Sequence, residues 1–222
     1  SHLEEFSRRT GGAYGTPVEL ALRHSVLPYF TIFRPADVFN GAIAAISGST
    51  VERLKFLLGM PASPAGALYP LSHCNACAID DINRFGLAYW HCVHQLPASY
   101  LCPIHHEPLL TSEVRLNGLG RSQLFLPRDP RLKSHVAAID LASSALPLLE
   151  RLSDLAAATL QRKLPGGFDE RSLQACYRFG LAQMGLLTPA GSIRATEFVK
   201  ALVAHFGPIS TIPPFNRVVS AS

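Results

Sequence analysis

The chain has 222 residues and a formal net charge of +4, and 48% of its residues are hydrophobic. This length allows one large domain or two small ones with a buried core. The sequence shows no apolar run of membrane-spanning length and no signal-peptide layout, and an odd number of cysteines, five, fits a reducing cytosol better than a disulfide framework. Composition therefore argues against membrane-spanning and disulfide-rich secreted proteins, and it predicts a cytoplasmic one.

Residues 1–60 show the pattern of three or four short helices separated by turns that contain glycine. The start signals are an apolar stripe from Leu3, an N-cap with a first-turn proline at Thr16-Pro17, Pro35, and a second N-cap at Thr50. Such helices are typical of a helix-turn-helix unit and equally of any small helical bundle. Both interpretations of this region stay open.

Residues 61–112 contain two pairs of candidate metal ligands with the same spacing. Cys74-Asn75-Ala76-Cys77 and Cys102-Pro103-Ile104-His105 each place two donors three positions apart, so that one tight turn can point both at a single ion. Four such donors complete the closed tetrahedral shell of a structural zinc site. We therefore predict a zinc ribbon that holds one Zn²⁺ through Cys74, Cys77, Cys102 and His105, with short strands at 87–91 and 100–102.

Further cysteine and histidine side chains in this region leave other ligand sets open: His73, His91, Cys92, His94 and His106. We interpret Cys92 as a small buried hydrophobe, the common fate of a free cysteine. His106 could replace His105 only if the second pair were one residue longer. Reduced thiols without any metal are the remaining alternative.

The sequence argues against an enzyme. His105-His106-Glu107 has the letters of the H-x-E element of zinc deaminases, but it follows the C-x-x-C pair instead of preceding it. Four good ligands also leave no open position for a catalytic water. We expect the adjacent carboxylates Asp80 and Asp81 to cap a turn or short helix.

The second half of the chain is predicted to be a basic connector at 113–133, with a strand at 123–126, followed by a helical region at 134–222. Ser134 is expected to cap the first helix, which Pro147 bends or restarts, and further helices are expected after Asp169 and at 194–206. The predicted fold is thus mainly α with a small zinc-ribbon β element.

Positive charge is concentrated at 111–133 and from 161 to the end, as expected if one face meets a polyanion such as DNA. Ordinary solvated loops and helix faces are the alternative. The candidate DNA-binding residues are Arg115, Arg121, Arg128, Arg131, Lys133, Arg171, Arg178 and Arg194.

The order of motifs in the ribbon resembles the TniQ family, which contains the target-selecting proteins of heteromeric DNA transposons, some of them CRISPR-associated. The residues that carry the resemblance are Cys74-x-x-Cys77, Tyr89-Trp90-His91, His94-Gln95-Leu96-Pro97, Cys102-Pro103-x-His105 and Pro108-Leu109. The first helix and the segment from Tyr177 to Arg194 resemble TnsD-like members less specifically.

This resemblance implies an adaptor and not a catalyst. Such a protein marks an insertion site, either by binding DNA directly or by binding a CRISPR effector complex that carries a guide RNA. It then recruits the AAA+ ATPase TnsC, and the implied location is the bacterial cytoplasm, at the nucleoid. A helix-turn-helix and zinc-ribbon transcription regulator without a transposition partner is the alternative.

Overall fold

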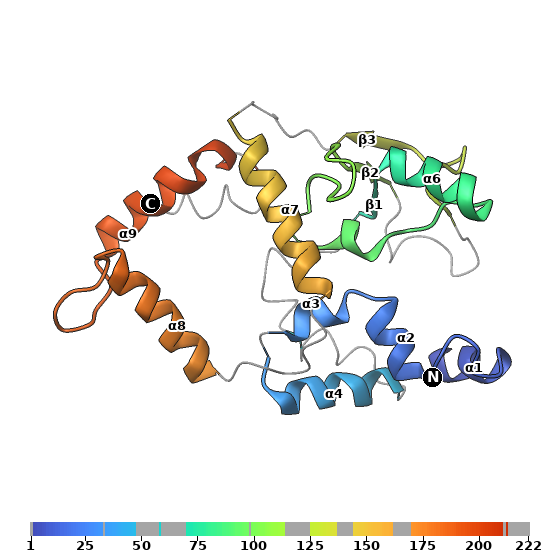
Figure 1. Cartoon of the computed structure of the whole chain (residues 1–222), viewed down its shortest axis with the longest axis horizontal. Coiled ribbons are helices and arrows are strands. Elements are labelled where there is room, and N and C mark those ends of the chain that lie inside the picture. Colours follow the sequence, from blue (N-terminus) through green and yellow to red (C-terminus); the bar gives the residue numbers. More distant parts are fainter. Residues whose placement is uncertain are drawn as a thin grey trace.

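A computed structural model describes residues 2–32, 34–47, 58, 70–97, 99–113, 125–136, 144–161, 170–210 and 212. The protein is mainly helical and contains one small antiparallel sheet, which confirms the coarse fold class (Figure 1). None of the helices in these ranges is long and apolar enough to cross a lipid bilayer. The predicted boundaries of the domains stay a prediction.

In the N-terminal part, the described residues form the helices α1 (His2–Arg9), α2 (Pro17–Arg23), α3 (Leu27–Thr31) and α4 (Ala36–Ser47). Gly11 and Gly12 have positive φ angles of 60° and 75° after α1, which confirms the predicted stop. Thr16 and Glu19 form a capping box at the start of α2, as predicted. α3 was not predicted, and the cap expected at Thr50 lies outside the described residues.

A small apolar cluster holds these helices together. Its buried members are Ala21, Leu27, Ala42 and Leu58. The partly buried side chains around them are Leu3, Leu22, Phe30, Ile43 and Ile46. The cluster explains how four short helices pack, but it does not distinguish a helix-turn-helix unit from another helical bundle, so that assignment stays a prediction.

In the central part, the described residues form a three-stranded sheet, a helix and a 3-10 turn. The sheet is antiparallel in the order β1 (Ser72–His73), β2 (Leu110–Ser112) and β3 (Ser134–Val136). His73 pairs with Leu110, and Leu110 pairs with Val136 on its other side. α6 (Asn75–Phe85) follows β1 directly, and η3 (Cys92–Gln95) lies further along the chain. We call residues 70–113 together with β3 the metal module.

Three sequence expectations in this part are wrong. The strand predicted at 87–91 is irregular chain leading into η3, and the strand at 100–102 is reduced to a single bridge between Leu101 and Pro108. Ser134 begins strand β3 instead of capping a helix. All three residues of β3 pair with β2, which is more than twenty residues away in sequence. No local pattern could therefore reveal that pairing.

The C-terminal part contains α7 (Leu146–Gln161), α8 (Glu170–Gln183), α9 (Ala195–Phe206) and the short η4 (Gly207–Ile209). These bounds confirm the helices predicted after Pro147, after Asp169 and at 194–206. In Figure 1, α7 lies beside the metal module and its lower end reaches α3, whereas α8 and α9 lie on the opposite side of α7 from the module. Of the strand predicted at 123–126, Phe125 and Leu126 are described and are not in a strand.

α7 packs directly against the chain that carries the metal-ligand candidates. The buried apolar cluster there consists of Leu101, Ala145, Leu149, Ile209 and Ile212. The hydroxyl of Ser153 on α7 accepts hydrogen bonds of 3.3 Å from the backbone N–H groups of Tyr100 and Leu101. Since Leu101 precedes Cys102, the position of that cysteine is coupled to the packing of α7.

Candidate metal centre

The first ligand pair lies at the N-terminus of α6. Cys74 is the N-cap residue, with extended φ and ψ angles of −95° and 135°, and Cys77 follows in the first turn of the helix. Positions three apart in a helix lie on the same face, so both sulfur atoms point the same way. The pair was expected on a tight turn, and this expectation is corrected to a helix start. The positive end of the helix dipole also favours thiolates there.

The second pair lies on a compact turn. The N–H of His106 donates to the carbonyl of Cys102 over 2.8 Å, and the N–H of Cys102 donates to the carbonyl of Glu107 over 2.8 Å. His106 has a φ of 57°, in the left-handed region. The N–H groups of Ile104 and His105 both point at Cys102 Sγ over 3.4 Å. This turn therefore fixes the directions of Cys102 and His105 relative to each other.

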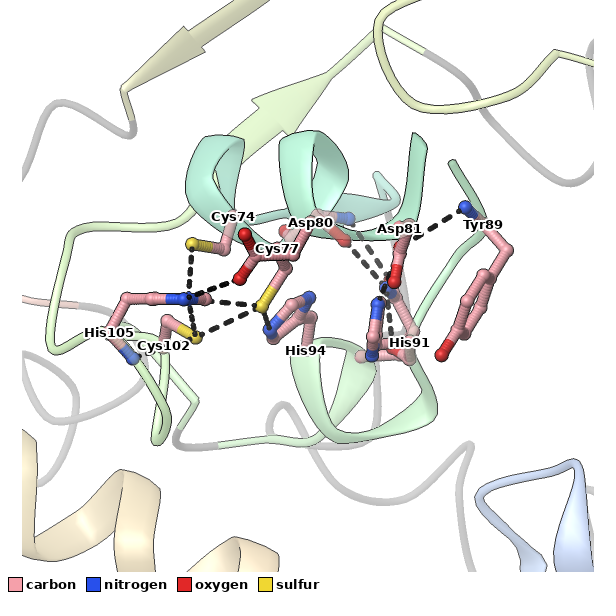
Figure 2. Close-up of polar contacts among 11 residues, drawn as sticks. Cys74, Cys77, Asp80, Asp81, Tyr89, His91, His94, Cys102 and His105 are labelled. Carbon is pink, nitrogen blue, oxygen red and sulfur yellow. Dashed lines mark hydrogen bonds and ion pairs between the residues drawn. The ribbon is translucent and has the colours of Figure 1, made fainter. Parts of the chain in front are cut away.

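The four predicted ligands converge on one point (Figure 2). One donor atom from each of Cys74, Cys77, Cys102 and His105 can be chosen so that all four lie within 4.8 Å of one another. His105 Nδ1 lies 3.6 Å from Cys74 Sγ, 3.3 Å from Cys77 Sγ and 3.7 Å from Cys102 Sγ, and the last two sulfurs are 3.6 Å apart. Tetrahedral coordination with bonds of about 2.0–2.3 Å places donor atoms about 3.5–3.8 Å apart. The cluster could thus hold one metal ion.

A bound cation would stabilise thiolates at the buried positions of this cluster. All three cysteines are buried, with exposed fractions of 0% for Cys74 and Cys102 and 3% for Cys77. Burial, together with the neighbouring thiols, raises the pKa of Cys77, and burial is also the main cause of the raised pKa of Cys74. Thiolates so close together repel one another, and a divalent ion would relieve that repulsion.

A carboxylate lies on the outer side of the imidazole ligand. His105 Nε2 is 3.2 Å from Asp80 Oδ2, one turn along α6 from Cys77. An N–H at Nε2 that donates to this carboxylate leaves Nδ1 with its lone pair directed at the three sulfurs. Carboxylates often orient metal-binding histidines in this way. Asp80 therefore lies within α6 and faces the cluster, instead of capping a turn.

A row of polar side chains continues from the cluster along α6. Asp81, which is 5% exposed, accepts a hydrogen bond of 2.9 Å from His91 Nε2, and the ring of Tyr89 stacks on His91 at 4.3 Å. His94 follows, 5.0 Å from the ring of His91, and its Nε2 is 3.9 Å from Cys77 Sγ. Burial lowers the pKa of His94 to about 3, so the ring is neutral at pH 7.

η3 is attached to the sheet by one side chain. Gln95 Nε2 donates to the carbonyl of Ser72 over 2.6 Å, and its Oε1 accepts from the N–H of Ser72 over 3.0 Å. The side-chain amide of Gln95 thus makes the two hydrogen bonds that the backbone of a neighbouring strand would make at the edge of β1. Sequence reasoning missed this role, although Gln95 lies within the motif that resembles the TniQ family. The bidentate contact fixes the position of the neighbouring His94.

The other candidate ligands do not join the cluster. Cys92 is half-buried on η3, and burial raises its pKa, in line with its interpretation as a small hydrophobe. His73 is 3% exposed and packs edge-on against Trp90 with ring centroids 5.7 Å apart. His106 is exposed on the turn. In the part of the chain that the structure describes, one group of three or more His, Cys, Asp or Glu side chains is spaced for a metal ion.

Three of the candidate DNA-binding residues lie beside the metal module. Arg128 has a φ of 67°, is exposed and donates to Asn75 Oδ1 over 3.0 Å, at the start of α6. Arg131 is paired with Asp129 over 2.6 Å and lies 4.9 Å from the ring centroid of Phe125. Hydrogen bonds from Arg131 hold the pKa of Asp129 at about 2, so this pair stays ionised at neutral pH. Lys133 is exposed next to β3.

The remaining candidates belong to α8, α9 and their connection. Arg171 is exposed near the start of α8. Arg178 Nη2 donates to the carbonyl of Gly191 over 2.7 Å, and Arg194 Nε donates to the carbonyl of Leu187 over 3.2 Å, so both stabilise the turn between the helices. Arg115 and Arg121 lie outside the described residues. The described candidates thus fall into two groups, one beside the metal module and one on α8, α9 and their connection.

No protein-family model matches the chain, and comparisons with curated proteins and with solved structures likewise give no match.

Proposed function

We propose that Cys74, Cys77, Cys102 and His105 bind one Zn²⁺ as a structural ion. Three thiolates and one imidazole suit zinc, because sulfur ligands are soft and a closed tetrahedral shell has no open position. The convergence of the four donor atoms is the observation that carries this proposal. The ion would fasten the N-terminus of α6 to the turn after Leu101 and hence to α7.

The same shell argues against catalysis at this ion. The His105-x-Glu107 pair has the letters of the zinc deaminase element, and Glu107 Oε2 lies 3.9 Å from Cys74 Sγ. A deaminase needs a water molecule as the fourth ligand, however, and here Cys102 takes that place. We therefore infer that the protein is not an enzyme.

We further propose that the protein is a target-site selection adaptor of DNA transposition. It would bind DNA, directly or through a guide-RNA effector complex, and recruit an AAA+ ATPase of the TnsC type at the bacterial nucleoid. Support comes from the resemblance of the ribbon motifs to the TniQ family. It also comes from the position of Gln95 and His94 within the metal module, which gives two of the resembling residues a structural reason for their spacing.

DNA binding would use the exposed basic side chains near the module and on the C-terminal helices. Arg128, Lys133 and Arg171 present their charges to solvent, whereas the charge of Arg131 is balanced by Asp129. Each contact with a phosphate releases counterions, so affinity should fall with salt at a slope of about 0.9 per contact. Replacing Arg128 and Lys133 by Gln should reduce that slope by about 1–2. Arg151→Gln, an exposed arginine on α7 outside both basic stretches, is the matched control.

The decisive experiment is a pull-down of the zinc-loaded protein with an AAA+ ATPase of the TnsC type, with and without duplex DNA. Retention of the ATPase that DNA strengthens supports the adaptor. DNA binding without any retention of the ATPase supports the transcription regulator instead. Turnover that depends on the metal would contradict both.

A further inference from the structure

The three sulfur atoms of the cluster differ in the N–H groups that surround them. Cys102 Sγ faces the backbone N–H groups of Ile104 and His105 over 3.4 Å. For Cys74, the backbone N–H groups of Cys77 and Ala76 counteract part of the rise in pKa that burial causes. Such donors stabilise a metal-bound thiolate by spreading its negative charge. In the described part of the chain, Cys77 Sγ has no backbone donor of this kind within hydrogen-bond distance.

A buried histidine lies where the missing donor would be. His94 is 2% exposed, and its Nε2 is 3.9 Å from Cys77 Sγ, within reach of an N–H···S contact. Figure 2 shows the Cys77 sulfur between the ring of His105 on one side and the ring of His94 on the other. His94 therefore approaches this one sulfur from outside the cluster.

The position of the proton on His94 follows from its surroundings. His94 Nδ1 is buried and has no hydrogen-bond partner among the described residues. A buried N–H without an acceptor is destabilising, so a neutral ring keeps its proton on Nε2, where an acceptor exists. The acceptor is the sulfur of Cys77.

We propose that the Nε2–H of His94 donates a hydrogen bond to the Cys77 thiolate and so positions and stabilises this metal ligand. The inference rests on the proposed metal centre and adds one residue to it. His94 is not a fifth or alternative ligand, because His105 Nδ1 contacts all three sulfurs whereas His94 contacts only Cys77. Gln95 and β1 hold η3 in place and thereby fix His94 at its position.

The first test compares the Zn²⁺ affinity of variants by competition with a chelator. His94→Phe fills the same space without a donor and should lose about 10–100-fold in affinity. His94→Gln keeps an N–H and should retain more of the affinity than His94→Phe. The control is His73→Phe, since His73 is an equally buried histidine that no sulfur contacts. Equal losses in His94→Phe and His73→Phe would overturn the inference.

The second test needs no variant. In the Zn²⁺-loaded protein labelled with ¹⁵N-histidine, NMR should show the His94 proton on Nε2. With ¹¹³Cd²⁺ in place of zinc, that proton should show a coupling to the metal through the Cys77 sulfur. A proton on Nδ1 would overturn the inference even if the metal binds normally. A wild-type protein that binds no stoichiometric Zn²⁺ would instead refute the metal centre on which the inference rests.

Discussion

The metal module and the helical segments differ in what fixes their structure. In the module, contacts join residues far apart in sequence, such as Cys77 to Cys102 and Ser72 to Thr111. In the helical segments, ends are set within a few residues, by the capping box of Thr16 and Glu19 at the start of α2 or by Gly185, whose N–H donates to the carbonyl of Ala182 at the end of α8. The module should therefore fold cooperatively around an ion, whereas these helix ends should respond to local changes alone.

Removal of the metal should have the largest effect and should separate the two regions. Zinc in comparable peptides contributes about 10–16 kcal/mol to folding at pH 7, so chelation should unfold the module while much of the helical signal persists. The chain contains a single tryptophan, Trp90, within the module. Its Nε1–H donates to the carbonyl of Phe125 over 2.8 Å, so its fluorescence should report this loss while circular dichroism follows the helices.

Single cysteine variants give the matched comparison for that experiment. Cys77→Ser should abolish the stoichiometric metal, as measured by elemental analysis, and should mimic chelation. Cys176→Ser, an exposed cysteine on α8, should leave both metal content and Trp90 fluorescence unchanged. If Cys77→Ser loses its metal but keeps the native Trp90 signal, the ion does not hold the module together.

The junction between the module and α7 should show the next largest effect. Leu149 is fully buried against Leu101, beside the ligand Cys102, whereas Leu155 on the same helix is 59% exposed. Leu149→Ala should lower the free energy of unfolding by about 2–5 kcal/mol through the cavity it leaves. Leu155→Ala should change it by no more than about 0.5 kcal/mol. Urea unfolding of the zinc-loaded protein, followed by Trp90 fluorescence, measures both, and similar values for the two variants would contradict the packing described.

The clustering of Cys74, Cys77, Cys102 and His105 was predictable from sequence, because four donors at matched spacing constrain one another. The local conformation was not, since a spacing of three fits both a tight turn and the first turn of a helix. Asp80 and Asp81, three and four positions after Cys77, carry the helical spacing that could have indicated α6. The sheet escaped prediction because strands of two or three residues show no periodicity, and their partners are distant in sequence.

The roles of the histidines were the hardest to predict, because they too depend on contacts between segments that are distant in sequence. The run from Trp90 to His94 alternates in a way that favours a strand, which would place Cys92 and His94 on one face. The chain instead turns at η3, since Gln95 binds the backbone of Ser72 and Asp81 binds His91. These are contacts between segments that lie 10 and 23 residues apart. A pattern within one short run cannot contain them.

Two glycines of the C-terminal segment test how α8 and the turn before α9 are stabilised. Gly191 has a φ of 79°, and an added Cβ would lie 2.7 Å from Arg178 Nη2, so Gly191→Ala should destabilise the turn by about 1–2 kcal/mol. Gly180 lies within α8 with open space around it, and Gly180→Ala should instead stabilise that helix by about 0.5–1 kcal/mol. Hydrogen exchange of α8 and α9 measures both effects. Changes of the same sign in the two variants would contradict this geometry.

The smallest effect should be a local response to acid at the start of α2. The backbone N–H and the hydroxyl of Thr16 donate to Glu19 over 2.8 and 3.0 Å and hold the pKa of this carboxyl below its ordinary value of 4.5. Because the folded pKa is the lower one, the capping contribution is fully present above the ordinary value and is lost as the pH falls through the folded pKa. NMR titration should show the Thr16 amide signal moving with a midpoint below 4.5, and Glu19→Gln should remove that movement.

A midpoint at or above the ordinary value would mean that the capping box does not persist in solution. Because the contact lies in α1–α4, the Trp90 signal of the module should not follow this titration.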